Sequence, residues 1–296
     1  MTNTLFAFSE CSEAAKWLAA ELGIGFSEIA LRHFPDGESL VRVEPAANVA
    51  LLYRSLDDPN AKLVELLLAA SALRESSARR VMLVAPYLAY MRQDMAFRPG
   101  EAVSQHVIGG LLASHFDGVL TVDPHLHRIA SLAEVMPGTE AIALSAAPAL
   151  SAALAGADRP LLVGPDSESR QWVEAIAAPL GLDVLVGEKF RSGDREVAIR
   201  ISGVEQARGR LAVLVDDVIS SGETLIAAAQ LLREAGAVRI EALVTHCLAH
   251  EADFARMERA GIASLRFTDS VGRAGGTIPL APLIAAEIHR RGWVED

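Results

Sequence analysis

The chain has 296 residues, and its length, composition and charge already exclude several classes of protein. A typical domain has about 150 residues, so we expect two domains that each bury a core. Hydrophobic residues make up 51% of the chain and aromatic residues only 5%, which suits alternating helices and buried parallel strands. The net charge of −11 excludes a broadly basic nucleic-acid surface, so any anionic ligand must bind at local basic clusters.

The cysteines and the apolar segments argue against disulfides, a zinc site and a membrane span. Cys11 and Cys247 lie far apart and have no partners at metal-ligand spacing. The segment from Met1 to Glu10 lacks the basic start and apolar core of a signal peptide, and no apolar run reaches the roughly 20 residues that span a bilayer. We therefore expect a cytoplasmic protein without membrane or nucleic-acid partners.

Two stretches of the chain follow the same strand–helix–strand plan. In each, a buried strand leads through a polar loop into an amphipathic helix and then into a second strand. The expected elements are strand 49–53, helix 62–74 and strand 80–85 in the first stretch, and strand 211–215, helix 224–234 and strand 239–245 in the second. Leu73-Arg74-Glu75 and Leu232-Arg233-Glu234 occupy the same place in the two stretches. This match indicates duplicated α/β domains.

The repeated plan predicts an α/β fold of two tandem domains, each with a mostly parallel sheet flanked by helices. A stretch rich in Ala, Ser, Gly and Pro, at residues 150–160, indicates a linker. We therefore expect an N-terminal domain at residues 1–150 and a C-terminal domain at residues 151–296. Ligands of such sheets gather at the carboxyl ends of the strands, so the residues that follow each strand are the candidates for chemistry.

The strongest chemical signal follows the expected strand at 211–215. Two carboxylates end the strand, and a Ser/Ser/Gly/Thr loop opens a helix whose free N–H groups and dipole can hold a phosphate. An ordinary capped turn could contain any three of these residues, but the whole string is more specific. A Walker-type phosphate loop is absent from the sequence. The candidate residues are Asp216, Asp217, Ser220, Ser221, Gly222, Glu223 and Thr224.

This string resembles the phosphoribosyl-diphosphate-binding motif of type I phosphoribosyltransferase-fold proteins, in which the acidic pair meets the ribose hydroxyls and the loop binds the 5-phosphate. Further motifs occur in one order at 33–38, 86–94, 121–125, 164–166 and 188–191. Together they look like a ribose-phosphate pyrophosphokinase, or phosphoribosyl-diphosphate synthetase, from about residue 5 to the C-terminus. The segment 97–104, and His125 followed by His127, resemble the short archaeal-type members.

The resemblance implies an activity, a cofactor and an assembly. Family members transfer the diphosphate of ATP to C1 of ribose 5-phosphate, which yields AMP and phosphoribosyl diphosphate for nucleotide biosynthesis. We therefore expect ATP and ribose 5-phosphate as substrates, Mg²⁺ as cofactor and a homo-oligomer of two or more subunits. The N-terminal phosphoribosyltransferase-like domain would supply nucleotide and interface residues, and the C-terminal one the ribose 5-phosphate site and the catalytic loop.

The resemblance also implies roles for residues outside the phosphate loop. The loop with Phe34 frames adenine and, in the family, reaches the site of a neighbouring subunit. The implied ATP-binding residues are Phe34, Asp36, Glu38, Arg92, Gln93 and His125; the implied metal-site residues are His125 and Asp166; the implied catalytic cations are Lys189 and Arg191. Each has a plain structural interpretation as well, such as a Pro-Asp-Gly turn for the first loop or a solvated basic hairpin tip for the last.

Two departures from the family pattern leave other functions open. Glu223 stands where the family often has a small residue, and an inward carboxylate would repel the 5-phosphate. Ser167-Glu168-Ser169-Arg170 follows Asp166, where the family usually has glycine or small residues. The alternatives are a phosphoribosyltransferase that consumes phosphoribosyl diphosphate and a noncatalytic regulatory relative. The retained Lys189 and Arg191 argue against both, and AMP release separates all three functions.

Overall fold

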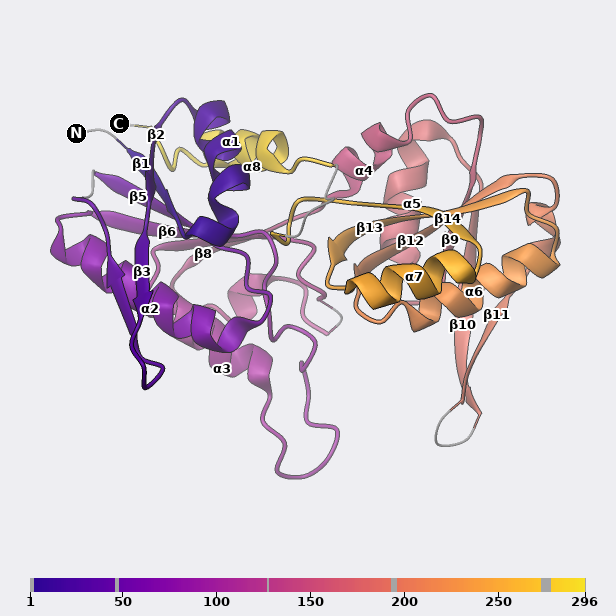
Figure 1. Ribbon diagram of the computed structural model, residues 1–296, viewed down its shortest axis with the longest axis horizontal. Helices are drawn as coiled ribbons and strands as arrows, with labels where there is room; N and C mark the ends of the chain where they lie inside the picture. The colour runs from indigo at the N-terminus through magenta and orange to yellow at the C-terminus, as the bar shows by residue number, and fades with distance from the viewer. Residues whose placement is uncertain (1–2, 46–47, 127, 193–195, 273–277, 296) are drawn as a thin grey trace. The chain divides into compact units, whose positions relative to one another are not determined.

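A computed structural model describes residues 3–45, 48–126, 128–192, 196–272 and 278–295, with the backbone alone between 190 and 198 (Figure 1). The chain forms two compact units. Unit 1 contains the residues up to Ser145, the short segment Ser270–Gly272 and the residues from Pro279 onward. Among the described residues, unit 2 contains Ala146–Asp269 and Ile278.

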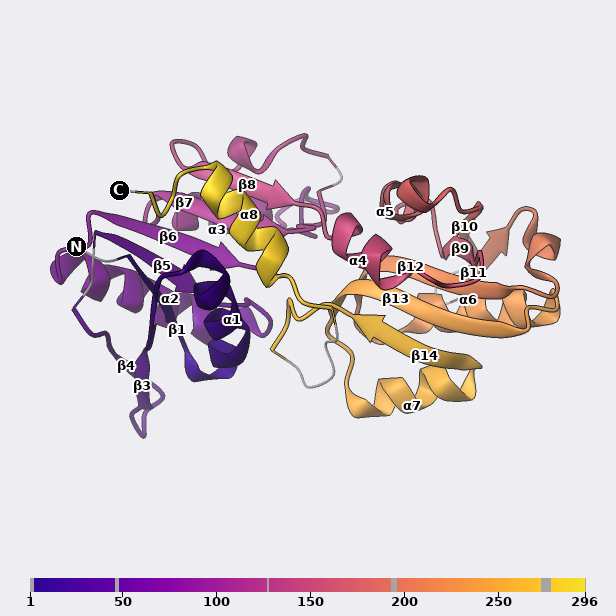
Figure 2. The ribbon, with the colours of Figure 1, turned by 90° about the horizontal axis from the view of Figure 1, so that it is seen from above.

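Unit 1 is built around a parallel sheet with the strand order β2-β1-β5-β6-β7-β8 in its described residues. Its strands are β1 Thr4–Ala7, β2 Gly25–Glu28, β5 Val49–Tyr53, β6 Arg80–Ala85, β7 Gly118–Val122 and β8 Glu140–Leu144. Its helices are α1 Ser12–Leu22, α2 Pro59–Glu75, α3 Ser104–Ala113 and α8 Ala281–Arg290, with short η1 Ser9–Cys11 and η2 Leu132–Glu134. Figures 1 and 2 show α1 and α8 on one face and α2 and α3 on the other. Every residue of β5 and β7 is buried because helices cover both faces.

A separate hairpin completes unit 1. Strands β3 Ala30–His33 and β4 Ser39–Arg42 pair with each other in antiparallel fashion, apart from the main sheet. The hairpin lies beside α2 (Figure 1). Leu31 and Val41 pack against the apolar core of the unit, so one face of the hairpin is attached to it.

Unit 2 repeats this plan with the strand order β11-β10-β9-β12-β13-β14 among its described residues. Its strands are β9 Leu161–Gly164, β10 Val184–Ser192, β11 Glu196–Ile201, β12 Leu211–Ile219, β13 Arg239–Cys247 and β14 Ile262–Phe267. Its helices are α4 Ala147–Ala153, α5 Arg170–Ala177, α6 Glu223–Glu234 and α7 Glu251–Arg259, with short η3 Ala178–Leu180 and η4 Val204–Ala207. All pairings are parallel except that of β10 with β11. Figure 2 shows α5 on one face, and α6 and α7 on the other.

The two sheets share one topology. The order β2-β1-β5-β6-β7 in unit 1 repeats as β10-β9-β12-β13-β14 in unit 2. The expected fold of two α/β domains with mostly parallel, helix-flanked sheets is therefore confirmed. In both units the direction of strand addition reverses next to the first strand, between β1 and β5 and between β9 and β12. In doubly wound sheets, ligands bind outside the carboxyl ends of the strands at this switch point.

The expected strands agree closely with those in the structure, with one informative difference. The bounds of β5 and β6 are those predicted from the sequence. Strand β12 continues four residues past the expected end at Val215, because Val218 and Ile219 still pair with His246 and Cys247 of β13. Asp216 and Asp217 therefore lie on a paired strand rather than in a loop. Within the described residues, no helix combines the length and the apolar character that crossing a bilayer requires.

The last helix belongs to unit 1, whereas the sequence placed the whole of residues 151–296 in a second domain. Helix α8 packs against α1, whose apolar residues supply the partner surface. Trp293 follows α8 in the chain and is 0% exposed. Its indole N–H donates to Glu140 Oε2 at 2.8 Å. A Cβ at Gly118 would lie 2.9 Å from the Trp293 ring. An amphipathic helix must bury its apolar face, and α8 does so on unit 1.

We predict that Trp293→Ala destabilises the protein by about 3–5 kcal/mol, because it removes a fully buried aromatic side chain and leaves a cavity. Urea unfolding followed by circular dichroism measures the change. Trp17→Ala is the matched control, since this side chain of α1 is 54% exposed and its loss should change stability by less than about 0.5 kcal/mol. Equal unfolding midpoints for the two variants would contradict the prediction.

Candidate active site

Three carboxylates gather at the switch point of unit 2. Asp216 and Asp217 lie near the carboxyl end of β12, and Asp166 follows β9, the strand that pairs with β12. Asp217 is buried and Asp216 is half-buried. The backbone N–H of Asp217 donates to Asp216 Oδ1 at 3.0 Å, which fixes the direction of that carboxylate. The topology thus brings the acidic pair and Asp166 to the same edge of the sheet, and the roles expected for these residues stay predictions.

The carboxylates of this cluster lie close enough to repel one another. Burial raises the pKa of Asp216 well above its usual range, and the nearby negative charges of Asp217 and Asp166 raise it further. Cations or hydroxyl donors from a ligand would relieve this repulsion. Across the part of the chain that the structure describes, no three His, Cys, Asp or Glu side chains already lie at metal-binding distances from one another. The site therefore offers oxygen ligands but no complete metal cage.

The loop after β12 has the backbone form of a phosphate site. Ser220 and Ser221 are exposed, and Gly222 has a φ of +74°, a conformation that favours glycine. A Cβ at Gly222 would also lie 2.8 Å from Sδ of Met257. Helix α6 begins directly afterwards at Glu223, and the first N–H groups of a helix have no intrahelical acceptor. These N–H groups and the helix dipole can receive an anion.

The side chain of Glu223 is held on the surface by α7. Its carboxylate forms an ion pair with Arg256, and both side chains are exposed. Arg256 also lies 3.6 Å from Asp253. The sequence led us to expect a negative charge beside the 5-phosphate, and Arg256 of helix α7 pairs with that charge. Because the side chain of Glu223 is paired with Arg256, its backbone N–H is the group better placed to bind a phosphate.

The segment after Asp166, which departs from the family pattern, forms a capped turn into α5. Asp166 Oδ1 accepts hydrogen bonds from the N–H groups of Glu168 at 3.1 Å and Ser169 at 3.2 Å. The Ser169 hydroxyl donates to the Asp166 carbonyl oxygen at 2.6 Å. One carboxylate oxygen of Asp166 is therefore occupied in the turn, and the carboxylate has a defined orientation. Hydrogen bonds within this polar segment thus hold Asp166 in place.

The expected hairpin that carries Lys189 and Arg191 is present as β10 and β11. Lys189 lies on β10 opposite Ile199, and its side chain is exposed. Arg191 lies two residues further along β10, but its side chain is outside the described part. A Cβ at Gly187 would lie 2.3 Å from the Pro165 carbonyl oxygen. This close approach brings the base of the hairpin beside the segment of Asp166.

In unit 1, the Phe34 loop is a tight turn between β3 and β4. The N–H of Phe34 donates to the Glu38 carbonyl oxygen at 2.8 Å, and that of Gly37 to the Phe34 carbonyl oxygen at 2.9 Å. Asp36 and Glu38 are exposed, and the Arg32 guanidinium lies over the Phe34 ring, 4.7 Å from its centre. Phe34 is half-buried, so its ring offers a flat apolar surface next to two carboxylates.

The other expected nucleotide residues of unit 1 lie on two loops that an ion pair joins. Arg92 is exposed, and the Gln93 amide donates to the Met95 carbonyl oxygen at 3.1 Å. His125 follows β7 with a φ of +46°, an uncommon conformation for a residue other than glycine. Arg128 Nη1 lies 2.6 Å from Asp94 Oδ1, so the segment after His125 is attached to the segment after Arg92. Sequence reasoning did not single out this pair; His127 is outside the described residues.

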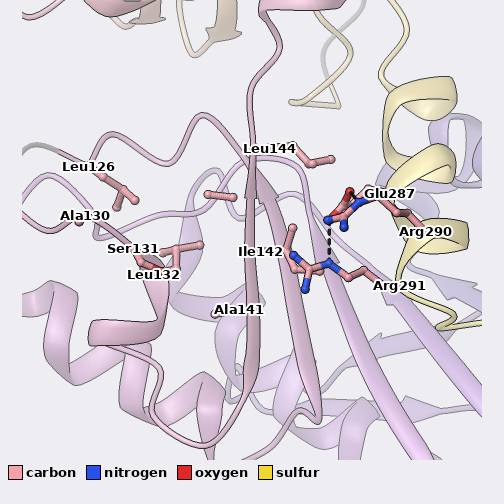
Figure 3. Close-up of a pocket in the computed structure, with 11 residues that line it drawn as sticks. Leu126, Ala130, Ser131, Leu132, Ala141, Ile142, Leu144, Glu287, Arg290 and Arg291 are labelled. Atoms are coloured by element: carbon pink, nitrogen blue, oxygen red, sulfur yellow. Dashed lines mark hydrogen bonds and ion pairs between the residues drawn. The ribbon is translucent and has the colours of Figure 1, made fainter.

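A pocket of about 380 Å³ lies elsewhere in unit 1 (Figure 3). It is lined by strand β8, by the segment around Leu132 and by the end of α8, where Arg290 and Arg291 both pair with Glu287. None of the expected site residues lines this pocket. We therefore locate the candidate active site from the residues at the strand ends and not from this cavity.

Comparison with known proteins identifies the class. Residues 3–115 match a family model described as the N-terminal domain of ribose phosphate pyrophosphokinase, and residues 138–260 match the phosphoribosyl transferase domain. The ribose-phosphate pyrophosphokinase of Methanopyrus kandleri is 31% identical over 96% of this chain and 98% of its own length. That of Thermococcus kodakarensis is 32% identical over 88% of this chain and 91% of its own. A crystal structure of phosphoribosylpyrophosphate synthetase from Mycobacterium smegmatis is 26% identical, covers 98% of both chains and has a TM-score of 0.83.

The fold and the acidic pair before a phosphate-type loop define a two-domain enzyme with phosphoribosyltransferase-like architecture. At this identity and coverage, the chain belongs to the ribose-phosphate pyrophosphokinase family. The family and the enzyme class expected from the sequence are confirmed.

We predict that Asp216→Asn raises the melting temperature at pH 7.5 by about 2–4 °C. The folded-state pKa of Asp216 lies above the ordinary value of 3.8. At a pH between 3.8 and the raised pKa, the protein therefore takes up a proton when it folds. Wild-type stability therefore falls as pH rises above 3.8 through the raised pKa. The variant lacks this loss, and its advantage should shrink at pH 5.

Thermal unfolding by circular dichroism at both pH values measures this difference. Asp158→Asn, at an exposed position of unit 2, is the control and should leave the melting temperature unchanged. If the variant is no more stable than wild type at pH 7.5, the ionised Asp216 carboxylate does not destabilise the fold.

Proposed function

We propose that the protein transfers the β,γ-diphosphate of ATP to the C1 hydroxyl of ribose 5-phosphate, which yields phosphoribosyl diphosphate and AMP. The observation that carries this proposal is the Asp216–Asp217 pair beside the start of α6, at the switch point of unit 2. Membership in the ribose-phosphate pyrophosphokinase family, over nearly the whole chain, supports the same reaction.

Ribose 5-phosphate binds to unit 2 in this proposal. The carboxylates of Asp216 and Asp217 accept hydrogen bonds from the ribose hydroxyls, which relieves the mutual repulsion that raises the pKa of Asp216. The hydroxyls of Ser220, Ser221 and Thr224, and the N–H groups of Gly222 and Glu223 at the start of α6, donate to the 5-phosphate. The pairing of Glu223 with Arg256 removes the negative charge that would oppose this binding.

The donor set of unit 2 suits magnesium, which prefers oxygen ligands and commonly takes one or two carboxylates together with substrate phosphates and water. Asp166 would hold the ion with the carboxylate oxygen that the turn leaves free of the Glu168 and Ser169 N–H groups. The family resemblance assigns His125 to the metal as well, through a bound water, or to a phosphate directly. Bound magnesium supplies charge neutralisation on the phosphates of ATP.

The chain's own cations would carry much of the remaining electrostatic stabilisation. The C1 oxygen of ribose 5-phosphate attacks the β-phosphorus in line, its proton passes to solvent, and the bond from the β-phosphorus to the α-phosphate oxygen breaks. Negative charge grows on the nonbridging and leaving oxygens. Lys189, Arg191 and Arg92 lower the energy of this state by position and charge.

The Phe34 turn and Gln93 serve the nucleotide. The Phe34 ring stacks on adenine, Asp36 or Glu38 accepts a hydrogen bond from its exocyclic amine, and Gln93 contacts the nucleotide. Because the family loop serves a neighbouring subunit, we also propose a homo-oligomer of two or more chains. The enzyme would act in the cytoplasm and supply nucleotide biosynthesis.

We predict that purified protein with ATP, Mg²⁺ and ribose 5-phosphate forms AMP and phosphoribosyl diphosphate together. A phosphorus NMR time course measures both products. Lys189→Ala should slow their formation by about 100-fold or more, because a cation is lost from the reacting diphosphate. Lys16→Ala is the control, since Lys16 is an exposed residue of α1 that lies over the Phe26 ring.

Two results would redirect the assignment. A wild-type protein that forms neither product across phosphate concentrations and nucleotide donors, but still binds phosphoribosyl diphosphate, would be a transferase or a regulatory relative. Undiminished turnover in Lys189→Ala would exclude Lys189 from the catalytic role.

A further inference from the structure

The turn that carries Phe34 depends on its attachment to the rest of unit 1. Among the described residues, β3 and β4 pair with each other and not with the main sheet. An isolated two-stranded hairpin is only marginally stable in water. The turn is therefore positioned by contacts between the hairpin and the rest of unit 1, which include the apolar core and helix α2.

One buried carboxylate on α2 contacts both ends of the turn. Glu65 is 2% exposed. Its Oε1 atom accepts a hydrogen bond from His33 Nε2 at 2.9 Å and another from Ser39 Oγ at 2.9 Å. His33 is the last residue of β3 and Ser39 the first of β4, so these two bonds bracket the segment 34–38.

The other oxygen of Glu65 is anchored in the core. Arg54 donates to Glu65 Oε2 at 2.7 Å, and its side chain is buried. Arg54 also donates to Glu10 Oε1 at 2.9 Å and to the Lys62 carbonyl oxygen at 3.1 Å, and its guanidinium lies 3.7 Å from the centre of the Phe8 ring. Arg54 has little freedom to move, so Glu65 is fixed at one end by a rigid partner.

This anchor occupies the switch point of unit 1. Arg54 follows β5 and Glu10 follows β1, the two strands between which the strand order reverses. Nearby, Lys62 pairs with Asp57 at 2.7 Å and donates to the Ser55 carbonyl oxygen at 3.1 Å. The point that carries Asp166 and the Asp216–Asp217 pair in unit 2 is occupied here by ion pairs within the protein.

Glu65 is held in its charged form. Burial raises the pKa of its carboxyl, but the hydrogen bonds from His33, Arg54 and Ser39 outweigh this effect and hold the pKa below its usual value. A buried carboxylate with donors on both oxygens is directional, because every alternative position leaves a buried charge without a partner. The bonds to His33 and Ser39 therefore define where the turn stands relative to α2.

We propose that Glu65 is a positioning residue for the adenine end of ATP. By holding His33 and Ser39, it fixes the Phe34–Glu38 turn in the arrangement that receives the base, without contacting the nucleotide itself. The proposal rests on the proposed function insofar as that function assigns this turn to adenine. It extends the nucleotide site to a buried residue of α2 and to the ion pairs behind it.

The test compares Glu65→Gln and Ser39→Ala with wild type. Glu65→Gln keeps the side-chain volume but loses the charge that orients His33 and Arg54. Ser39→Ala removes one of the two bonds to the hairpin and leaves the pair of Arg54 with Glu65 intact. Arg42→Ala is the control, because Arg42 also lies on β4 but pairs with the exposed Glu44.

Steady-state kinetics should separate positioning from general damage. We expect the KM for ATP to rise about tenfold in Glu65→Gln and about threefold in Ser39→Ala, with the KM for ribose 5-phosphate and kcat within twofold of wild type. Arg42→Ala should match wild type in all three. Equal losses for both substrates, or a fall in kcat alone, would overturn the positioning role.

Two further readouts distinguish a failure of this inference from a failure of the proposed function. Hydrogen exchange at the Phe34 and Gly37 amides should accelerate in Glu65→Gln, and calorimetric ATP binding should weaken by the same factor as the KM. If wild type binds ATP but forms no product, the proposed function fails, while exchange and binding still decide the role of Glu65. Unchanged ATP affinity with a loosened turn would overturn the inference alone. Absence of ATP binding by wild type would overturn both.

If Glu65→Gln fails to fold, Ser39→Ala decides the question by itself, because its substitution lies on the hairpin and leaves the core ion pairs in place. An ATP affinity equal to that of Arg42→Ala would then overturn the inference.

Discussion

Ligands of parallel sheets with helices on both faces bind outside the carboxyl ends of the strands, and this constraint indicates where each unit can do chemistry. In unit 2 it places Asp166 after β9 beside the acidic pair of β12. The same constraint explains why Gly187 matters, since a side chain there would collide with the Pro165 carbonyl oxygen and separate the β10–β11 hairpin from this edge. The loop, the carboxylates and the base of the hairpin share one edge because β9, β10 and β12 run parallel and all three features lie at their carboxyl ends.

The two units use the same topological point in opposite ways. In unit 2 this point carries Asp216 and Asp217, and burial together with the nearby negative charges of Asp217 and Asp166 raises the pKa of Asp216. The proposed function assigns hydroxyl and cation ligands to these carboxylates. Unit 1 fills the matching point with Arg54 and its carboxylate partners, Glu10 and Glu65. In the functions proposed above, one copy of the duplicated fold binds the sugar phosphate and the other supports a neighbouring loop.

The departures from the family pattern are compensated locally. Glu223 would oppose a phosphate at the start of α6, but Arg256 of α7 neutralises it on the surface. The segment after Asp166 is polar where the family has small residues, yet its backbone N–H groups bind the Asp166 carboxylate and orient it. Both compensations preserve the electrostatics that the proposed diphosphate transfer requires.

The sequence by itself determined the two-domain α/β class, the bounds of β5 and β6, and the family. Those features are local: strand hydrophobicity, turn residues and an uninterrupted motif can be recognised within a few neighbouring positions. Only the tertiary structure decided that α8 and Trp293 belong to unit 1, that Glu223 pairs with Arg256, and that Glu65 joins both ends of the Phe34 turn. These partners are far apart in the chain, and no local pattern specifies which buried face or charge a distant segment will meet. Packing selects them because each amphipathic helix must cover an apolar surface and each buried charge must find a partner.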